Sequence, residues 1–577
     1  MPAAEAAAVV PARPAGGALS HLDLSALVFG AFGLFLAVLV GLPLAWLAYY
    51  ALTDANGAPT LANLTRLVTD ETLWAPLRIS LIVATCVGVL SAAVAAPIAW
   101  LAARTDMPGR RFVRVMVTAS FVTPPFLGAI AWEILAAPNS GLLNQWYRWL
   151  YDLPPFVALF DIYTVTGLVF VDACYAFPFV FVLIANALDR MPGDMEDASA
   201  ILGAKPWRTA WRITVPLALP AIIAGMMVAF LRSLTLFGTP AILALPGNFH
   251  TITTKIWSLF QYPPNPGLAA AASIPLLLLT ILLLRAEGWI LGRRGYAVIG
   301  GKASPPRPVA LKAFRWPALA LCILVLCMPV FLPYLALARA ALTKTIGEPL
   351  SLANLSLDHV RFVFLEFSPT RLAFWNTVVL AVATATVGTA LALVIAYVVS
   401  RKAAAGHRVL AFLATAPIAV PGIVLGVGLF LAYTRGPVVL YGTLWILFLA
   451  YLTIELPVAY QQLQSAFQSL HPELEEAGRL FGAGRMRTLK DILAPLLKSG
   501  VLAAWCFIFI GVMRELSAAV MLFTAQTKVI AVVIYDLNES GDLGAISVLG
   551  ITLLVVTFAI VFLAQRVSGL TGRARVA

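Results

Sequence analysis

The 577-residue chain carries few groups whose type and spacing could perform catalysis. The nearest approach to a phosphate-binding loop is the stretch from Tyr296 to Ala303, which lacks the first glycine of GxxxxGK[ST] and the hydroxyl after the lysine. The five cysteines form no CxxC pair, and the five histidines are scattered with no HExxH motif. We therefore predict that the chain holds no catalytic residue, no cofactor and no metal site, and is not an enzyme.

Charged residues inside apolar segments are the more informative groups. Arg232 and Arg514 lie 16 and 19 residues beyond the prolines that open their segments, which is roughly 24–29 Å along a helix. A charge at such depth is costly and usually faces a cavity or a partner. One interpretation is that Arg232, Arg514 and Glu515 line a transport pathway. The alternative is that each arginine pairs with a carboxylate, such as Glu515 or Glu455, and only holds helices together.

The composition indicates which elements position these charges. Residues of the set AVILMFWYC make up 61% of the chain and charged residues 11%, whereas soluble chains are about 45–50% apolar and about 25% charged. This excludes a soluble enzyme, a disordered chain and a secreted disulfide scaffold, and it requires a lipid membrane as solvent. Aromatic and basic residues do not alternate on one solvated surface, so we predict no nucleic-acid partner despite the net charge of +12.

Twelve apolar runs are each long enough to cross a bilayer, which takes roughly 20 residues. All are predicted to be helices, because backbone polar groups in hydrocarbon must pair within their own segment. The runs cover residues 26–51, 78–103, 113–136, 163–188, 217–236, 268–292, 316–342, 374–399, 409–433, 438–464, 497–517 and 545–566. The predicted fold class is therefore an all-α polytopic membrane protein.

The basic residues predict the orientation of these helices. If the N-terminus lies inside and the runs alternate, 27 of the 39 Lys and Arg residues fall inside, 10 fall outside, and Arg232 and Arg514 remain within spans. Basic residues concentrate on the cytoplasmic side of membrane proteins. We therefore expect both termini to be cytoplasmic, and the net charge is mostly a topology signal.

The chain is a duplication. PLRISLIVATCVGVLSAAVAAPIAWLAART at residues 76–105 resembles AFWNTVVLAVATATVGTALALVIAYVVSRK at residues 373–402, and Ser80 aligns with Thr377. Each half holds six runs, so the two six-helix halves are predicted to run parallel about an axis along the membrane normal. The predicted domains are a cytoplasmic tail at 1–25, a first membrane domain at 26–292, a cytoplasmic linker at 293–315, a second membrane domain at 316–566 and a tail at 567–577.

Two cytoplasmic loops share one pattern, 279 residues apart. They read DMEDASAILGAKPWRTAWRITVPLALP at 194–220 and ELEEAGRLFGAGRMRTLKDILAPLLKS at 473–499. Each predicts a short helix that ends at Gly203 or Gly482, since glycine accepts the left-handed conformation after a helix. A basic amphipathic helix follows, and Pro216 or Pro495 marks the start of the next span. An ordinary solvated linker gives no reason for two copies in register.

This pattern resembles the EAA loop of binding-protein-dependent ABC transporter permeases, roughly E-A-A-x-x-x-G followed nine residues later by I-x-L-P. The matching residues are Asp197-Ala198-Ser199, Gly203 and Ile213 to Pro216 in the first copy, and Glu476-Ala477-Gly478, Gly482 and Ile492 to Pro495 in the second. The departures are Asp for Glu, Ser or Gly for the second Ala, and Val or Ala for Leu.

The resemblance implies a type I ABC importer permease fold in a bacterial inner (plasma) membrane. It also implies two copies of a cytoplasmic ABC ATPase, which would hold the ATP and Mg, and a periplasmic substrate-binding protein. In that family the loops dock on the ATPases. The residues that the resemblance assigns to this coupling are Glu196, Asp197, Ala198, Gly203, Pro216, Glu475, Glu476, Ala477, Gly482 and Pro495.

The cargo is predicted from resemblance alone. The fusion of both halves, FLRSLTLFGTPAIL at 230–243 and GVMRELSAAVMLF at 511–523 resemble the ferric-iron permeases, to which the thiamine permeases are related. Polyamine, sulfate and phosphonate permeases share the loop pattern, so these cargoes stay open. An ion-driven secondary transporter would explain twelve spans and a duplication, but it gives no reason for the matched loops.

Overall fold

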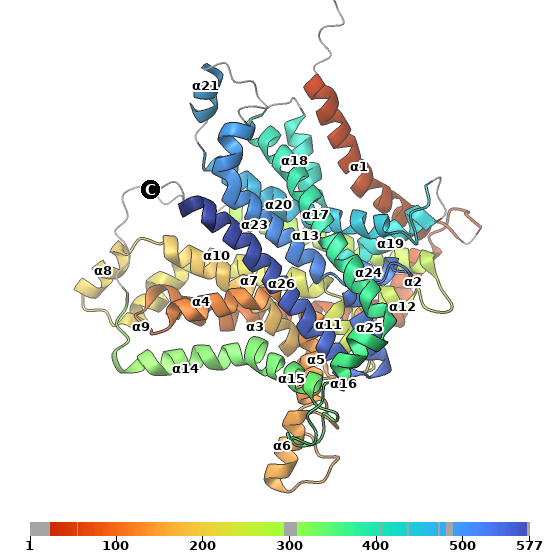
Figure 1. Ribbon diagram of the computed structural model, residues 1–577. Coiled ribbons are helices and arrows are strands. Elements are labelled where there is room, and N and C mark those ends of the chain that lie inside the picture. Colours follow the sequence, from red (N-terminus) through yellow and green to blue (C-terminus); the bar gives the residue numbers. More distant parts are fainter. Residues whose placement is uncertain are drawn as a thin grey trace, which may run out of the picture.

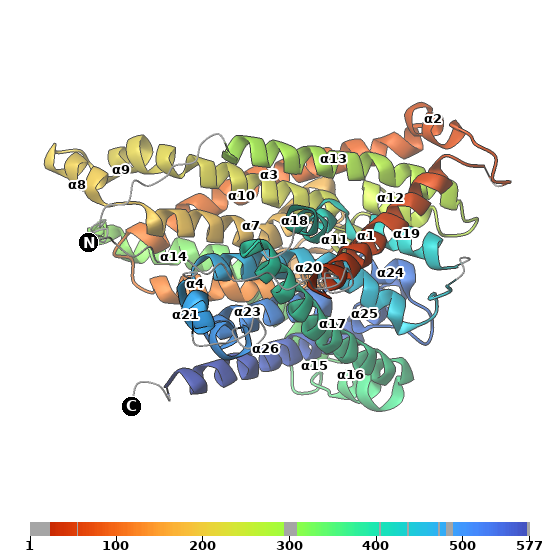
Figure 2. The same cartoon turned by 90° about the horizontal axis from the view of Figure 1, so that it is seen from above.

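The computed structural model describes residues 24–292 except Ala55, and residues 308–573 except 403–405, 435–437, 471–472 and 481–488. The described residues form helices joined by turns, and their only β-structure is three isolated bridges. The long helices run alongside one another between the end that carries α8 and α21 and the end that carries α2 and α12 (Figure 1; Figure 2). The prediction of an all-α fold is confirmed.

Ten helical stretches of the described chain are long and apolar enough to cross a membrane, and two bent pairs raise the count to twelve. The long helices of the first half are α1 (Leu24–Ala51), α3 (Glu71–Arg104), α4 (Arg110–Ala119) with α5 (Pro125–Ala136), α7 (Val165–Arg190), α10 (Val215–Thr235) and α13 (Pro266–Gly292). Those of the second half are α14 (Arg315–Leu326) with α15 (Leu332–Leu342), α17 (Ser368–Ser400), α18 (His407–Thr415) with α19 (Gly422–Thr434), α20 (Leu444–Gln468), α23 (Ala494–Met513) and α26 (Leu543–Arg573).

Shorter helices connect the spans at both ends of the molecule. They are α2 (Ala62–Thr69), α6 (Leu142–Tyr151), α8 (Asp194–Ile201), α9 (Pro206–Thr209), α11 (Gly238–Leu243), α12 (Ile252–Ser258), α16 (Asp358–Arg361), α21 (Glu473–Leu480), α24 (Ala519–Leu522) and α25 (Ile530–Ser540).

Two predicted spans are not single straight helices, which corrects the sequence interpretation. The stretch predicted at 113–136 bends by 101° between α4 and α5, and the stretch predicted at 409–433 bends by 106° between α18 and α19. The breaks fall at Pro124 and Pro421. A proline disfavours the helical conformation in the residue before it, and Thr123 and Val420 are both extended, with ψ of 122° and 108°. The two prolines are 297 positions apart, so both halves share the break.

The duplication also appears in the packing of side chains on backbone. The hydroxyl of Ser80 on α3 accepts a hydrogen bond from the N–H of Ile252 at 2.8 Å, at the start of α12. The hydroxyl of Thr377 on α17 accepts one from the N–H of Ile530 at 2.9 Å, at the start of α25. Both contacts are buried, and each ties a short helix to the second long helix of its own half. The alignment of Ser80 with Thr377 thus corresponds to one contact made twice.

The first long helix of each half packs on the other half. α1 lies against α19, where the absence of a side chain on Gly428 lets the backbone of Pro43 approach; a Cβ on Gly428 would lie 2.8 Å from the Pro43 carbonyl oxygen. At the equivalent contact of the other half, the indole N–H of Trp132 on α5 donates to the carbonyl of Met328, between α14 and α15, at 3.2 Å. The halves are therefore interlocked, and the predicted domain boundaries stay a prediction.

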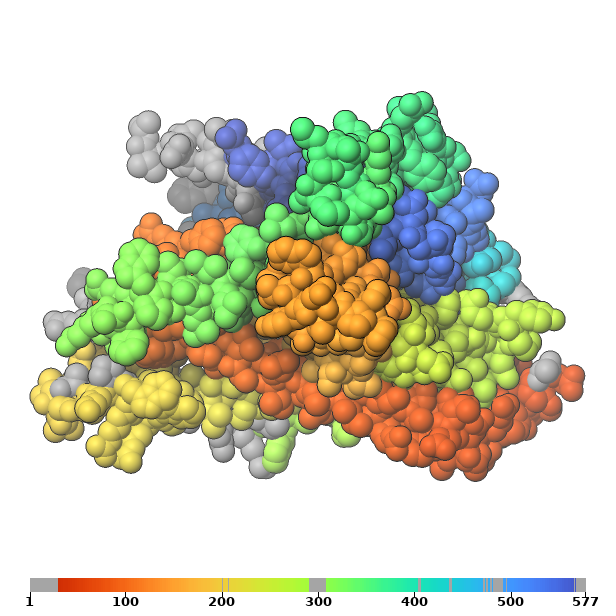
Figure 3. Space-filling view, turned by 90° about the horizontal axis from the view of Figure 1, so that it is seen from below, coloured from red at the N-terminus to blue at the C-terminus, as the bar shows by residue number. Residues whose placement is uncertain are grey.

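The segment that holds α6, between α5 and α7, forms a projection. α6 and the loop after it stand out from the face of the bundle seen in Figure 3, beside the segment that contains α14 and α15. Buried Asn144 donates to the carbonyls of Ala137 and Phe160 and accepts from the N–H groups of Leu159 and Phe160, at 2.8–2.9 Å. The amide side chain of Asn144 thus joins α6 to the chain segments before and after it.

The repeated contact leads to a prediction. Replacement Thr377→Val keeps the shape of the side chain but leaves the buried N–H of Ile530 without an acceptor, which costs about 1–3 kcal/mol. We expect a lower thermal unfolding midpoint for the purified, detergent-solubilised chain. Thr377→Ser retains the hydroxyl and serves as the control, so equal midpoints for the Val and Ser variants would contradict the assigned role.

Candidate coupling loops and central cavity

The first of the two matched loops turns at a left-handed glycine. α8 ends at Ile201, and Gly203 follows with φ of +79°. No atom lies within 4 Å of the place that a Cβ on Gly203 would take. The backbone conformation, and not crowding, therefore explains the glycine. The prediction that α8 ends at Gly203 is confirmed.

The helix after Gly203 continues into the next span, which corrects the prediction of a separate amphipathic helix. α9 leads directly into a π-helical segment, Ala210–Thr214, and then into α10. Pro216 has no N–H to donate to the carbonyl one turn earlier, and the helix widens just before it. Pro216 thus lies inside a continuous span over Trp207–Thr235 and not at its start.

The second loop repeats this geometry where it is described. Another π-helical segment, Leu489–Leu493, lies directly before the turn that holds Pro495, 279 positions after the first. Glu476 and Ala477 are exposed on α21. Gly482 and the side chain of Glu475 lie outside the described part of the chain, so their predicted roles stay predictions.

Glu196 faces inward and anchors α8. Its Oε2 lies 2.8 Å from a guanidinium nitrogen of Arg104, and its Oε1 accepts a hydrogen bond from the hydroxyl of Thr214 at 2.7 Å. Arg104 is fully buried and also donates to the carbonyls of Leu188 and Met191 at 3.4 and 3.3 Å. One ion pair therefore joins α8 to the ends of α3 and α7 and to the segment before α10.

Large apolar side chains are exposed on α8 and directly after it, a feature that the sequence reasoning missed. Ile201 and Leu202 are 85% and 87% exposed, and Met195 is also exposed. Leu480, at the end of α21 and 279 positions after Ile201, is 88% exposed. Large apolar side chains gathered in the open usually mark a contact with another molecule. The sequence does carry a signal for this exposed apolar surface, because a pair of apolar residues stands directly before each loop glycine.

Two other predicted coupling residues lie on the same helix. Asp197 is half-buried and Ala198 is exposed.

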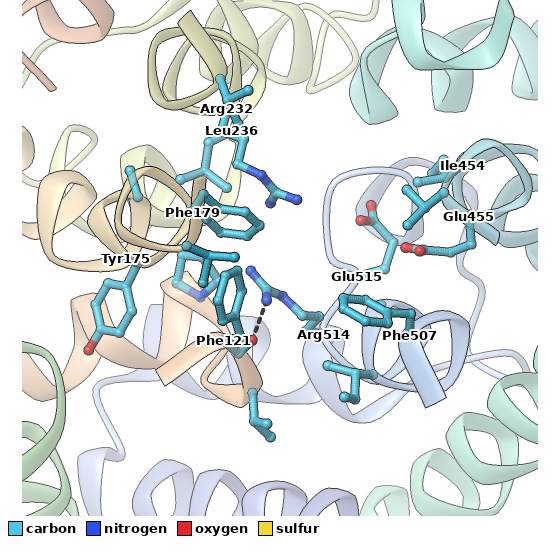
Figure 4. Close-up of a pocket in the computed structure, with 18 of the residues that line it drawn as sticks. Phe121, Tyr175, Phe179, Arg232, Leu236, Ile454, Glu455, Phe507, Arg514 and Glu515 are labelled. Carbon is cyan, nitrogen blue, oxygen red and sulfur yellow. Dashed lines mark hydrogen bonds between the residues drawn. The ribbon is translucent and has the colours of Figure 1, made fainter. Parts of the chain in front are cut away.

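A cavity of about 1530 Å³ lies between the two halves. Its walls come from α4, α7 and α10 of the first half and from α20 and α23 of the second, and the breaks at Pro124 and Pro421 open onto it. Figure 4 shows Arg232, Arg514 and Glu515 around this space, together with Glu455. The structure thus brings the three predicted pathway residues to one cavity.

The two arginines reach the cavity without carboxylate partners. The guanidinium of Arg232 lies over the ring of Phe179, 3.6 Å from its centroid. Nη1 of Arg514 donates to the carbonyl of Phe121 at 2.5 Å (Figure 4), a carbonyl left free because the residue four positions later is Pro125. Within the described residues no salt bridge of 4.0 Å or less involves either arginine. Neither arginine therefore forms a direct salt bridge with a carboxylate of the described residues, and whether the pair lines the transport pathway or holds helices together stays a prediction.

The carboxylates occupy the opposite side of the cavity. Glu455 packs on Gly511, where a Cβ would lie 2.2 Å from its Oε1. Oε1 of Glu515 accepts a hydrogen bond from the N–H of Ala518 at 2.8 Å, so this side chain caps the turn after α23. Another in-span carboxylate, Asp172, accepts from the hydroxyl of Ser233 at 2.9 Å.

The family described as "Binding-protein-dependent transport system inner membrane component" matches residues 95–294 and again residues 388–569. The chain belongs to this family. Each match covers most of one half, as the duplication requires. With up to twelve candidate spans, this permease is a multi-pass protein of the inner membrane.

The permease is similar to proteins named for iron transport. It is 26% identical over 480 residues to the "Ferric transport system permease protein FbpB" of Actinobacillus pleuropneumoniae, covering 80% of this chain and 66% of that protein. It is 24% identical over 547 residues to the "Fe(3+)-transport system permease protein FbpB 2" of Haemophilus influenzae, covering 92% and 97%. The matched part thus spans just under two thirds of the first relative and nearly all of the second. A "Molybdenum transport system permease protein ModB" of Escherichia coli is 27% identical over 38% of this chain.

The anchor of α8 in this permease leads to a second prediction. Glu196→Gln leaves the buried guanidinium of Arg104 without a countercharge, and breaking such a pair costs about 3 kcal/mol. We expect faster amide hydrogen exchange across residues 188–214 and a lower unfolding midpoint in detergent. Asp197→Asn, one residue away, is the matched control. Replacing both partners, as Arg104→Met with Glu196→Leu, removes the uncompensated charge and restores much of the midpoint. Exchange unchanged in Glu196→Gln would refute the anchoring role.

Proposed function

We propose that this permease is the transmembrane subunit of an ATP-driven ABC importer, with the central cavity as the path of the cargo. The observation that carries the proposal is the pair of matched loops, each presenting a short helix whose last residue, Ile201 or Leu480, is an exposed aliphatic side chain. Such a residue at the tip of a soluble loop is stabilised by burial in a partner's groove. Two equivalent loops fit two copies of one partner, a cytoplasmic ABC ATPase.

Force from the ATPases would reach the cavity through the anchor of α8. The Arg104–Glu196 pair links α8 to α3, and the hydrogen bond to Thr214 links it to the helix that carries Arg232. A pull on α8 would therefore move α3 and α10 together and not merely bend the loop. Closure of the two ATPases around ATP and Mg would bring α8 and α21 together and change the side to which the cavity opens.

The remaining parts of the assembly follow from this assignment. ATP hydrolysis belongs to the ATPases, so the permease itself acts without a cofactor and is not an enzyme. A periplasmic substrate-binding protein would deliver cargo at the end opposite α8 and α21. The loops that carry α8 and α21 then lie in the cytoplasm, as do both termini.

Ferric iron is the cargo that we propose. Two relatives named for ferric transport align with 80% and 92% of this chain, including both halves. Relatives named for molybdenum align with only 38% of it. Thiamine, polyamine or phosphonate are alternative cargoes for the same machine, and an ion-driven secondary transporter is the alternative of a different class.

The docking surface can be tested directly. Ile201→Asp and Leu480→Asp place a charge where the ATPase groove would have to desolvate it, so we expect at least a tenfold loss of ATPase co-purified with the tagged permease. Leu352→Asp changes an equally exposed leucine, 91% exposed, away from both loops and should leave the yield unchanged. Gly203→Asn keeps a residue that tolerates the left-handed conformation and should co-purify better than Gly203→Trp. Normal ATPase yield with Ile201→Asp and Leu480→Asp would count against docking at these helices.

The cargo is tested by uptake into cells that lack the chromosomal copy of this permease. We expect the complemented strain to accumulate labelled ferric iron in preference to labelled thiamine or molybdate. An ATPase variant that binds but does not hydrolyse ATP should abolish the uptake, whereas a proton or sodium ionophore at constant cellular ATP should not. Uptake that follows the ion gradient would favour the secondary transporter, and preferential uptake of another solute would replace iron as the cargo.

A further inference from the structure

Four charged side chains of the central cavity form two separate pairs. Arg232 and Arg514 lie together beside Phe179 and Phe121, whereas Glu455 and Glu515 lie on the facing side (Figure 4). The arginines come from the end of α10 and from the residue directly after α23. We call Arg232 and Arg514, one from each half, the positive wall, and Glu455 and Glu515, both from the second half, the negative wall; the other charged residues that line the cavity are Arg114, Asp172 and Glu287.

Most hydrogen-bond donors of the positive wall are not used by the protein. A guanidinium carries five N–H donors. Arg514 uses one guanidinium nitrogen to donate to the carbonyl of Phe121. Arg232 contacts Phe179 through the face of its guanidinium, which uses none of its N–H donors. An aromatic ring and a carbonyl hold the two side chains in place without neutralising their charges. The remaining donors are available to whatever occupies the cavity.

Arg232 and Arg514 repel one another, and because no carboxylate of the described residues lies within 4.0 Å of either guanidinium, this repulsion is offset only by Glu455 and Glu515 on the facing side of the cavity. An oxyanion between them removes this repulsion and accepts paired, charge-assisted hydrogen bonds, for which the planar guanidinium is well suited. Arg232 is exposed, so its guanidinium is accessible from the cavity. The pair thus has the geometry of an oxyanion clamp with one arm from each half.

The negative wall restricts which oxyanions fit. Glu455 carries no described hydrogen bond, and Gly511 leaves room for its carboxylate beside the cavity. A ligand that is negative throughout would be repelled by Glu455, whereas a cationic centre would be attracted to it. A metal ion that keeps an oxyanion ligand presents both charges and matches both walls.

We propose that Arg232 and Arg514 bind an oxyanion in the central cavity, and that the cargo passes this point as a metal ion still chelated by an oxyanion. The inference rests on the proposed function only in taking the cavity as the cargo path. The binding step itself needs neither ATP nor a partner protein.

The probe is labelled inorganic phosphate, measured by equilibrium dialysis against the full-length permease in detergent at low ionic strength. Loss of one charge-assisted hydrogen-bonding group costs about 1.5–3 kcal/mol, so Arg232→Gln and Arg514→Gln should each weaken phosphate binding about tenfold or more. Arg78→Gln is the matched control, since Arg78 also stacks on an aromatic ring, 5.0 Å from the centroid of Trp74, but does not line the cavity. Glu455→Gln should tighten the binding of phosphate alone.

Arg514→Lys guards against a folding artefact, because a lysine keeps the charge and a donor for the Phe121 carbonyl while losing the planar fork. It should keep the wild-type unfolding midpoint and bind phosphate more weakly than the wild type. No saturable phosphate binding, or equal binding in the wild type and both Gln variants, would overturn the inference. If phosphate binds as expected but labelled iron is not taken up by the complete transporter, the iron assignment fails and the oxyanion site stands.

Discussion

Backbone polar groups in hydrocarbon must be paired, and the rest of this structure depends on where that rule is broken. Several long helices contain prolines, but in the described chain only the breaks at Pro124 and Pro421 bend a candidate span sharply, by 101° and 106°. Both breaks open onto the central cavity, where polar side chains bond to the irregular backbone. Arg514 donates to the carbonyl freed by Pro125, and Glu515 accepts the N–H of Ala518. Charges at this depth thus exist partly because the backbone there is irregular.

The two halves are equivalent in scaffold and different in the cavity. Arg401 aligns with Arg104 and donates to the carbonyl of Leu470, which aligns with Met191. The π-helical segments also repeat in register. Arg232 and Arg514 do not align in this way. With the offset of 279 positions, Arg232 aligns with Gly511, which lies about one helical turn before Arg514. Arg232 and Arg514 therefore lie at comparable depth without being equivalent positions of the two halves. Gly511, the position equivalent to Arg232, leaves room for the side chain of Glu455.

The loops show how a surface contact becomes a movement of the membrane helices. On its outer side α8 exposes the apolar side chains of Met195 and Ile201, and on its inner side Glu196 contacts buried Arg104. A partner bound outside is thereby connected to α3, α7 and α10 through an ion pair with little solvent access. The predicted coupling residues divide accordingly: Glu196 positions the helix, Gly203 ends it, and Ala198 lies on its exposed surface.

Much of this could be read from the sequence because bilayer thickness and residue periodicity act locally. Apolar run lengths determined the number of candidate spans, the distribution of Lys and Arg predicted their orientation, and the repeated glycine and proline positions located both loops. The bends at Pro124 and Pro421, the partners of Arg232 and Arg514, and the exposure of Ile201 and Leu480 were decided only by the tertiary structure. These features depend on which helices meet, and residues hundreds of positions apart, such as Phe121 and Arg514, become neighbours only when the two halves interlock.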